Sequence, residues 1–88
     1  MALTPVRIEK RFRKRLGKKP PEMRKRIEDA VTQLRVDHRH PSLRTHRVWG
    51  RRGVWEARID EGNRLTFHWD GPRIVLRNHC NHDVLKTP

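Results

Sequence analysis

Side chains that can handle phosphate esters recur at alternating positions between residues 53 and 85. Alternation sends successive side chains to opposite faces of a strand. One face here is apolar, and the other gathers one glutamate, three arginines and two histidines, with a third histidine just beyond: Glu56, Arg58, Arg64, His68, Arg77, His79 and His82. Carboxylate and imidazole transfer protons, while guanidinium binds two phosphate oxygens at once. The pattern predicts a surface that binds a phosphodiester backbone and carries groups suited to cleaving it.

The charge of the chain points to the same class of ligand. Its 88 residues include 22 Lys and Arg against 10 acids, for a net charge of +12. Such a surface attracts polyanions, so nucleic acid is the first candidate partner, followed by a ribosome or an acidic protein. No apolar run approaches the roughly 20 residues that span a bilayer, and we expect no membrane partner. A single cysteine and no visible signal peptide predict a cytoplasmic protein.

Three strands and two tight turns would position these side chains. Residues 54–60, 63–69 and 73–79 alternate, and Glu61-Gly62 and Asp70-Gly71 are hairpin signals between them. The inward positions are apolar: Trp55, Ala57, Ile59, Leu65, Phe67, Trp69, Ile74 and Leu76. By the same alternation, Val75, Arg77 and His79 are expected to point outward.

Two helices would cover the apolar face. Residues 21–36 carry an apolar stripe at helical spacing, and Phe12 and Leu16 mark a shorter helix that Gly17 ends. Residues 5–8 are expected to form a short edge strand, and 37–52 a long basic connection. The sequence therefore predicts one α+β domain over 1–88, with both helices on one face of a mostly antiparallel sheet. The polar face is expected to remain open as a shallow trough.

The order of these segments resembles a known family. "PPEMRKRIEDAVTQL", "HPSLRTHRVWG", "GVWEARID", "NRLTF" and a terminal "HD" are similar to the RelE/ParE superfamily of bacterial toxins from type II toxin–antitoxin pairs. The resemblance implies a β-α-α-β-β-β microdomain and a cognate antitoxin. It implies either of two activities: metal-independent cleavage of mRNA in the ribosomal A site, as in RelE-like members, or inhibition of DNA gyrase, as in ParE-like members.

The resemblance also supplies roles for individual residues. Arg64 in "NRLTF" corresponds to the arginine that begins the penultimate strand in RelE-like nucleases, and His82 in "NHDVL" to a C-terminal catalytic histidine. Glu56 in "WEAR" lies near a family glutamate. These matches imply Glu56 or a histidine as the base, Arg64 as the phosphate clamp, and His82 or His68 as the acid. The chain departs from the pattern in having no tyrosine.

A second group of residues is expected to bind the RNA rather than cut it. Trp49 lies in the basic connection, where its ring can stack on a base. The other members are five basic side chains near the predicted site: Arg51, Arg52, Arg58, Arg77 and His79.

Each feature also has a plainer interpretation. Glu56 and Arg58 can form cross-strand charge pairs on a solvated face, and His68 or His82 can be structural. A non-catalytic module that binds RNA or the ribosome therefore remains a third hypothesis. The run His79-Cys80-Asn81-His82-Asp83 lacks the second compact pair of ligands that zinc sites use. We predict no metal and no cofactor.

Overall fold

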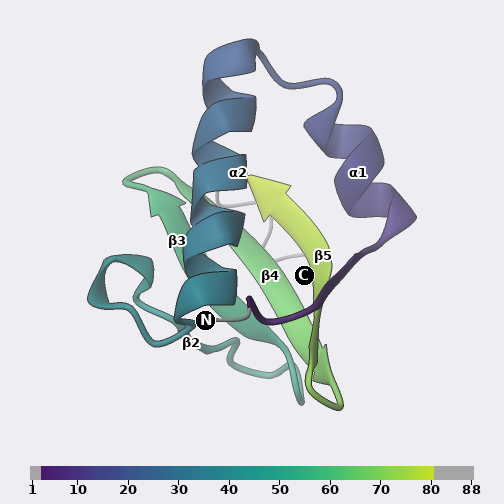
Figure 1. The fold of residues 1–88 in the computed structure, drawn as a ribbon, viewed down its shortest axis with the longest axis vertical. Coiled ribbons are helices and arrows are strands. Elements are labelled where there is room, and N and C mark those ends of the chain that lie inside the picture. Colours follow the sequence, from purple (N-terminus) through teal and green to yellow (C-terminus); the bar gives the residue numbers. More distant parts are fainter. Residues whose placement is uncertain (1–2, 81–88) are drawn as a thin grey trace.

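The computed structural model describes residues 3–80 as two helices on one side of a five-stranded sheet (Figure 1). The elements in chain order are β1 (Val6–Ile8), α1 (Lys10–Leu16), α2 (Pro21–Val36), a 3-10 turn η1 (Pro41–Leu43), β2 (His46–Arg47), β3 (Trp55–Asp60), β4 (Asn63–Asp70) and β5 (Arg73–Cys80). The strand order is β1-β5-β4-β3-β2; β1 runs parallel to β5 and the other pairs are antiparallel. The predicted α+β fold is confirmed.

Helix α2 has the predicted bounds. Pro21 at its start needs no hydrogen-bond partner for its nitrogen, and Glu22 in the first turn complements the helix dipole. Its apolar stripe buries Ile27, Ala30 and Leu34. The helix packs on β3, while α1 packs on β5 through Phe12 (Figure 1). None of the helices in the described region is long and apolar enough to cross a membrane.

The core lies between the helices and the inward face of the sheet. Its sheet side consists of Ala57, Leu65, Phe67, Ile74 and Leu76, each with no exposed surface. All five were predicted to point inward. The alternation therefore identified the face on which the helices pack.

The basic connection contains a strand that the sequence did not predict. Strand β2 is only two residues long and pairs with β3, with His46 opposite Glu56 and Arg47 opposite Trp55. A strand this short has no periodicity to detect. The pairing adds a fifth strand to the predicted sheet and brings His46 beside Glu56.

The prediction that His79 points outward toward RNA is wrong. Thr66 pairs with Asn78 but Phe67 pairs with Leu76, so Arg77 is an extra residue in β5. Such a bulge reverses the alternation beyond it. His79 is fully buried, its Nε2–H donates to the carbonyl of Phe12 at 3.1 Å, and its ring lies edge-on to the Phe12 ring at 4.5 Å.

The outward face is not open at its centre, contrary to expectation. Glu56 is 5% exposed, and Thr66 and Val75 are fully buried. Part of the reason is that longer side chains on this face lie against their neighbours, Arg64 against Glu56 and Arg77 against His68. The polar side chains therefore form separate clusters rather than a continuous trough.

Burial of His79 predicts that acid destabilises the fold. Burial lowers the pKa of His79, although its hydrogen bond to Phe12 opposes the shift. The unfolded histidine binds a proton near pH 6.5, so below that pH the unfolded state holds more protons and stability falls. The free energy of unfolding should decrease from about pH 7.5 to about pH 5, in urea titrations at each pH.

The variant His79→Leu isolates this contribution. It should be less stable than wild type at neutral pH by about 1–3 kcal/mol, because the Phe12 carbonyl loses its donor. Its stability should nevertheless depend less on pH. Lys25→Gln, at an exposed position of α2, is the control and should retain the wild-type slope. An unchanged slope in His79→Leu would show that His79 does not couple folding to protons.

Candidate active site

A buried carboxylate forms the centre of the candidate site. Glu56 lies on β3, between His46 on β2 and Thr66 on β4. Its Oε1 is 3.4 Å from Nε of Arg64 and 3.6 Å from Nε2 of His46. Three strands thus place an acid, a guanidinium and an imidazole in contact. The alternation predicted Glu56 and Arg64 on the same face of the sheet, and the two side chains are in contact.

Arg64 is held by the turn between β3 and β4. Its Nη1 donates to the carbonyl oxygens of Asp60, Asn63 and Glu61 at 2.7, 3.0 and 3.3 Å. Its Nε faces Glu56, and its Nη2 has no hydrogen bond to residues 3–80. The guanidinium is therefore fixed on one side and retains donors on the other, as a phosphate clamp requires.

Asp60 stabilises the turn that holds Arg64. Its carboxylate accepts hydrogen bonds from the Gly62 backbone and the Asn63 side chain at 3.0 and 2.8 Å, and from Arg26 at 3.3 Å. Burial would raise the pKa of Asp60, but these hydrogen bonds outweigh it and lower the pKa below its ordinary value. Asp60 thus remains ionised and orders the turn.

His46 is a site residue that the sequence analysis missed. Its Nδ1 lies 2.7 Å from the carbonyl oxygen of Arg44. A carbonyl oxygen only accepts, so Nδ1 carries a proton and Nε2 is the nitrogen that faces Glu56. The orientation suits proton transfer at Nε2. The sequence shows only a histidine in a basic loop, and the β2–β3 pairing was needed to place it.

A hollow of about 310 Å³ opens beside this cluster. It is lined by His46, Arg47, Val48, Trp49 and Glu56. Trp49 is 97% exposed. Trp49 belongs to the loop between β2 and β3, which turns at Gly50 and Gly53 with φ of 79° and 75°. The predicted Trp49 thus adjoins Glu56, and the exposed Arg51 and Arg52 follow in the same loop.

His68 and Arg77 form a second cluster on the outward face. Arg77 Nη1 lies 2.9 Å from Nδ1 of His68; a guanidinium only donates, so Nδ1 accepts and the imidazole is neutral. Burial and then the Arg77 charge lower the pKa of His68. A neutral histidine is poorly suited to the acid role predicted for it. Thr66 lies between His68 and Arg64 along β4.

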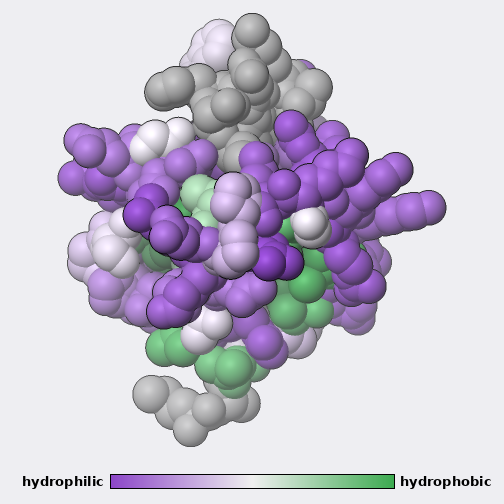
Figure 2. All heavy atoms as spheres, turned by 90° about the horizontal axis from the view of Figure 1, so that it is seen from above, coloured by the Kyte–Doolittle hydropathy of each residue, from purple (hydrophilic) through white to green (hydrophobic). Residues whose placement is uncertain are grey.

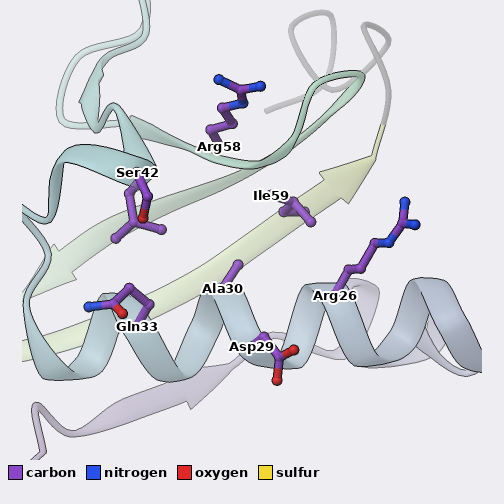
Figure 3. Close-up of a pocket in the computed structure, with 8 residues that line it drawn as sticks. Arg26, Asp29, Ala30, Gln33, Ser42, Arg58 and Ile59 are labelled. Atoms are coloured by element: carbon purple, nitrogen blue, oxygen red, sulfur yellow. The ribbon is translucent and has the colours of Figure 1, made fainter.

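Arg58 lies two residues beyond Glu56 on β3. It pairs across the sheet with Arg64, but β3 is irregular between Arg58 and Asp60. Arg58 also lines a hollow of about 280 Å³ on the α2 side, together with Arg26, Asp29, Gln33 and Ser42. Its guanidinium points away from α2 (Figure 3). No ion pair joins Arg58 to Glu56 within residues 3–80.

Two further predictions concern the histidine His82 and the absence of a metal site. His82, the candidate acid, lies outside the described residues. In the described part of the chain, no three His, Cys, Asp or Glu side chains are grouped as a metal site would need.

Hydrophilic side chains dominate the end of the molecule that is uppermost in Figure 1. Figure 2 looks down on that end, where hydrophilic residues cover most of the visible surface and hydrophobic ones appear in small patches. With a net charge of +12, a surface of this kind attracts a polyanion at long range.

The second cluster gives a direct test of the electrostatics of this face. Replacing Arg77 by Leu removes both a positive charge and a hydrogen-bond donor from His68, so the His68 pKa should rise toward its ordinary value. Titration of the imidazole signals by NMR would measure this change. Arg73→Gln, which removes an exposed charge from the same strand, should leave the His68 titration unchanged. No rise in Arg77→Leu would contradict the assigned contact.

Comparisons with known proteins identify the fold. The sequence matches no protein-family model and no curated protein. The structure resembles a chain of the toxin–antitoxin complex RelBE2 from Mycobacterium tuberculosis, with a TM-score of 0.70 and 21% identity, over 92% of this chain and 100% of that one. It resembles the YoeB/ParE toxin from Agrobacterium tumefaciens with a TM-score of 0.74 and 14% identity, over 89% and 98% of the two chains.

A third similar structure is YafQ from E. coli, with a TM-score of 0.70 and 10% identity, over 91% of this chain and 94% of that one. The similarity covers nearly the whole of each chain, so the arrangement of helices and strands is shared while most side chains differ. The chain therefore has the fold of the RelE-like toxins of toxin–antitoxin systems.

Proposed function

We propose that this protein is a RelE/ParE-superfamily toxin of a type II toxin–antitoxin pair, and that it inhibits translation by cutting mRNA on the ribosome without a metal. The fold supports the toxin assignment. The observation that carries the nuclease assignment is the contact of one buried carboxylate, Glu56, with both Arg64 and His46 beside a hollow. A carboxylate, an imidazole and a guanidinium thus meet at one place, the side-chain types that a base, an acid and a phosphate clamp require.

The proposed cleavage assigns one role to each of these groups. Glu56 accepts the proton of the ribose 2′-OH through Oε2, since Oε1 faces Arg64 and His46. The 2′ oxygen attacks the phosphorus, and Arg64 stabilises the charge that develops on the phosphate oxygens. The bond from phosphorus to the 5′ oxygen breaks, and protonated His46 supplies a proton to that oxygen. The products are a 2′,3′-cyclic phosphate and a 5′-hydroxyl.

The loop between β2 and β3 supplies the binding contacts in this proposal. The exposed Trp49 stacks on a base next to the scissile phosphate, where stacking contributes about 1–3 kcal/mol. Arg51 and Arg52 bind neighbouring phosphates, which adds affinity without sequence selectivity. The ribosome presents the mRNA as a single strand, the form in which a base is free to stack.

The proposed protein partner is a cognate antitoxin. Similar structures include RelBE2 from Mycobacterium tuberculosis and the DinJ–YafQ complex from E. coli, each described as a complex. A chain of net charge +12 favours a partner with an acidic segment.

One experiment compares Glu56 and Arg64 with an arginine elsewhere on the basic surface. Glu56→Gln and Arg64→Gln should each reduce cleavage of ribosome-bound mRNA by about 10²-fold or more, because each removes a group that acts in the transition state. Arg73→Gln, an exposed arginine on β5, should cut like wild type. Primer extension on a defined mRNA, with and without ribosomes, would show the cuts.

Three outcomes of that experiment are informative. Cuts in register with codons, and only with translating ribosomes, would support the proposal. Full activity in both site variants would show that neither Glu56 nor Arg64 takes part in cleavage. An absence of cuts by the wild type would contradict the nuclease; a DNA supercoiling assay would then distinguish gyrase inhibition from a non-catalytic module.

A separate prediction concerns His46. His46→Gln keeps a polar side chain but cannot carry the transferable proton, so the cleavage rate should fall by about 10²–10⁴-fold while ribosome binding is retained. Single-turnover cleavage and cosedimentation with ribosomes would measure the two quantities. Equal losses of binding and cleavage would instead indicate that His46 only binds the RNA.

A further inference from the structure

A second hollow, of about 420 Å³, lies beside the β2–β3 pair, where Trp55 points to the opposite face of β3 from Glu56. It is lined by His38, Arg39, His40, Pro41, Arg44, Thr45 and Trp55. His46 pairs with Glu56 and the next residue, Arg47, pairs with Trp55, so the Glu56 and Trp55 side chains point to opposite faces of the sheet. The proposed cleavage site uses no side chain that lines this second hollow; the two share only the backbone of Arg44, whose carbonyl holds His46.

Within residues 3–80, the lining has positive charge and aromatic rings but no carboxylate. The side chains of Arg39 and Arg44 are exposed and form no ion pair with any residue of the described chain. The Trp55 ring forms part of the wall and already has the Arg47 guanidinium 5.2 Å from its centre. Two imidazoles, from His38 and His40, complete a lining that suits a planar ring attached to an anion.

The backbone of this hollow is held in an uncommon conformation. Arg44 has φ of 46° and ψ of 41°, the left-handed region, which costs a residue other than glycine free energy. Its N–H donates to the Pro41 carbonyl at 3.2 Å, and its own carbonyl accepts from His46. The backbone of Arg44 therefore orients His46 beside the first hollow, while Arg44 itself lines the second.

One buried polar group at this place has no hydrogen-bond partner among residues 3–80. Oγ1 of Thr45 is buried and has no hydrogen bond in the described structure. An unpaired buried hydroxyl is costly, and native structures usually satisfy such a group with a protein atom, a water or a ligand. Thr45 directly follows the left-handed residue and lines the hollow.

We propose that this hollow is a second nucleotide subsite, which binds a base beside Trp55 and its phosphate between Arg39 and Arg44. The inference rests on the proposed function, since the nucleotide belongs to the RNA strand that passes Glu56. The volume lies within the roughly 300–1,000 Å³ of small-molecule sites. A free mononucleotide has the same chemistry, and the aromatic lining favours either over an acidic peptide.

NMR can test this subsite without any cleavage. The indole N–H of Trp55 and the imidazoles of His38 and His40 report on the hollow, while Trp49 reports on the cleavage site. The probes are AMP, a short oligoribonucleotide with 2′-deoxy sugars that prevent cleavage, and a hexaglutamate peptide. The oligonucleotide should shift the signals at both hollows, and AMP should shift those of Trp55 and the two histidines.

Variants make the test specific. Arg44→Asn removes the guanidinium but retains a residue that tolerates positive φ, and Arg39→Gln removes the other charge. Each substitution should raise, at least tenfold, the ligand concentration that is needed to reach half of the full Trp55 shift. Lys25→Gln, at the other end of α2, removes one charge elsewhere and should leave them unchanged.

The outcomes separate this inference from the proposed nuclease. Shifts at Trp49 without shifts at Trp55 would overturn the subsite and leave the nuclease intact. Shifts at Trp55 in a protein that cuts no mRNA would support the subsite and contradict the nuclease. Shifts at Trp55 with hexaglutamate but with neither nucleotide probe would overturn the subsite in favour of a protein partner.

Discussion

The buried carboxylate of Glu56 is the constraint on which the candidate site depends. A carboxylate removed from water is costly unless cationic or hydrogen-bonding partners compensate. Glu56 is 5% exposed, and Arg64 and His46 face the same oxygen. These two partners come from the strands on either side of β3. Pairing Glu56 therefore requires the sheet to assemble, and the assembled sheet brings the reactive groups together.

Backbone carbonyls, rather than other side chains, fix the two partners of Glu56. The turn after β3 holds Arg64 through three carbonyl oxygens, and the left-handed Arg44 peptide holds His46. Backbone geometry is less tolerant of movement than contacts between long side chains. The helices stabilise this frame from the opposite face, where the core packs, so chemistry and packing occupy different faces of the sheet.

Local periodicity predicted most of the fold but only part of the site. Helix α2 was predicted with its bounds because its stripe is long, and Glu56 and Arg64 were predicted together because alternation and a short turn determine their positions. His79 was misplaced because a bulge at Arg77 reverses the alternation. His46 was missed because β2 has only two residues and is recognisable as a strand only from its pairing with β3. Both failures concern contacts between strands, which a single segment does not encode.

A double-mutant cycle at Glu56 and Arg64 tests the central claim most directly. The rate of single-turnover cleavage on ribosomes would be measured for wild type, Glu56→Gln, Arg64→Gln and the double variant. If the two residues act as one unit, the double variant should be little slower than the slower single variant. Losses that multiply in the double variant would show that the two side chains act independently and would contradict the account.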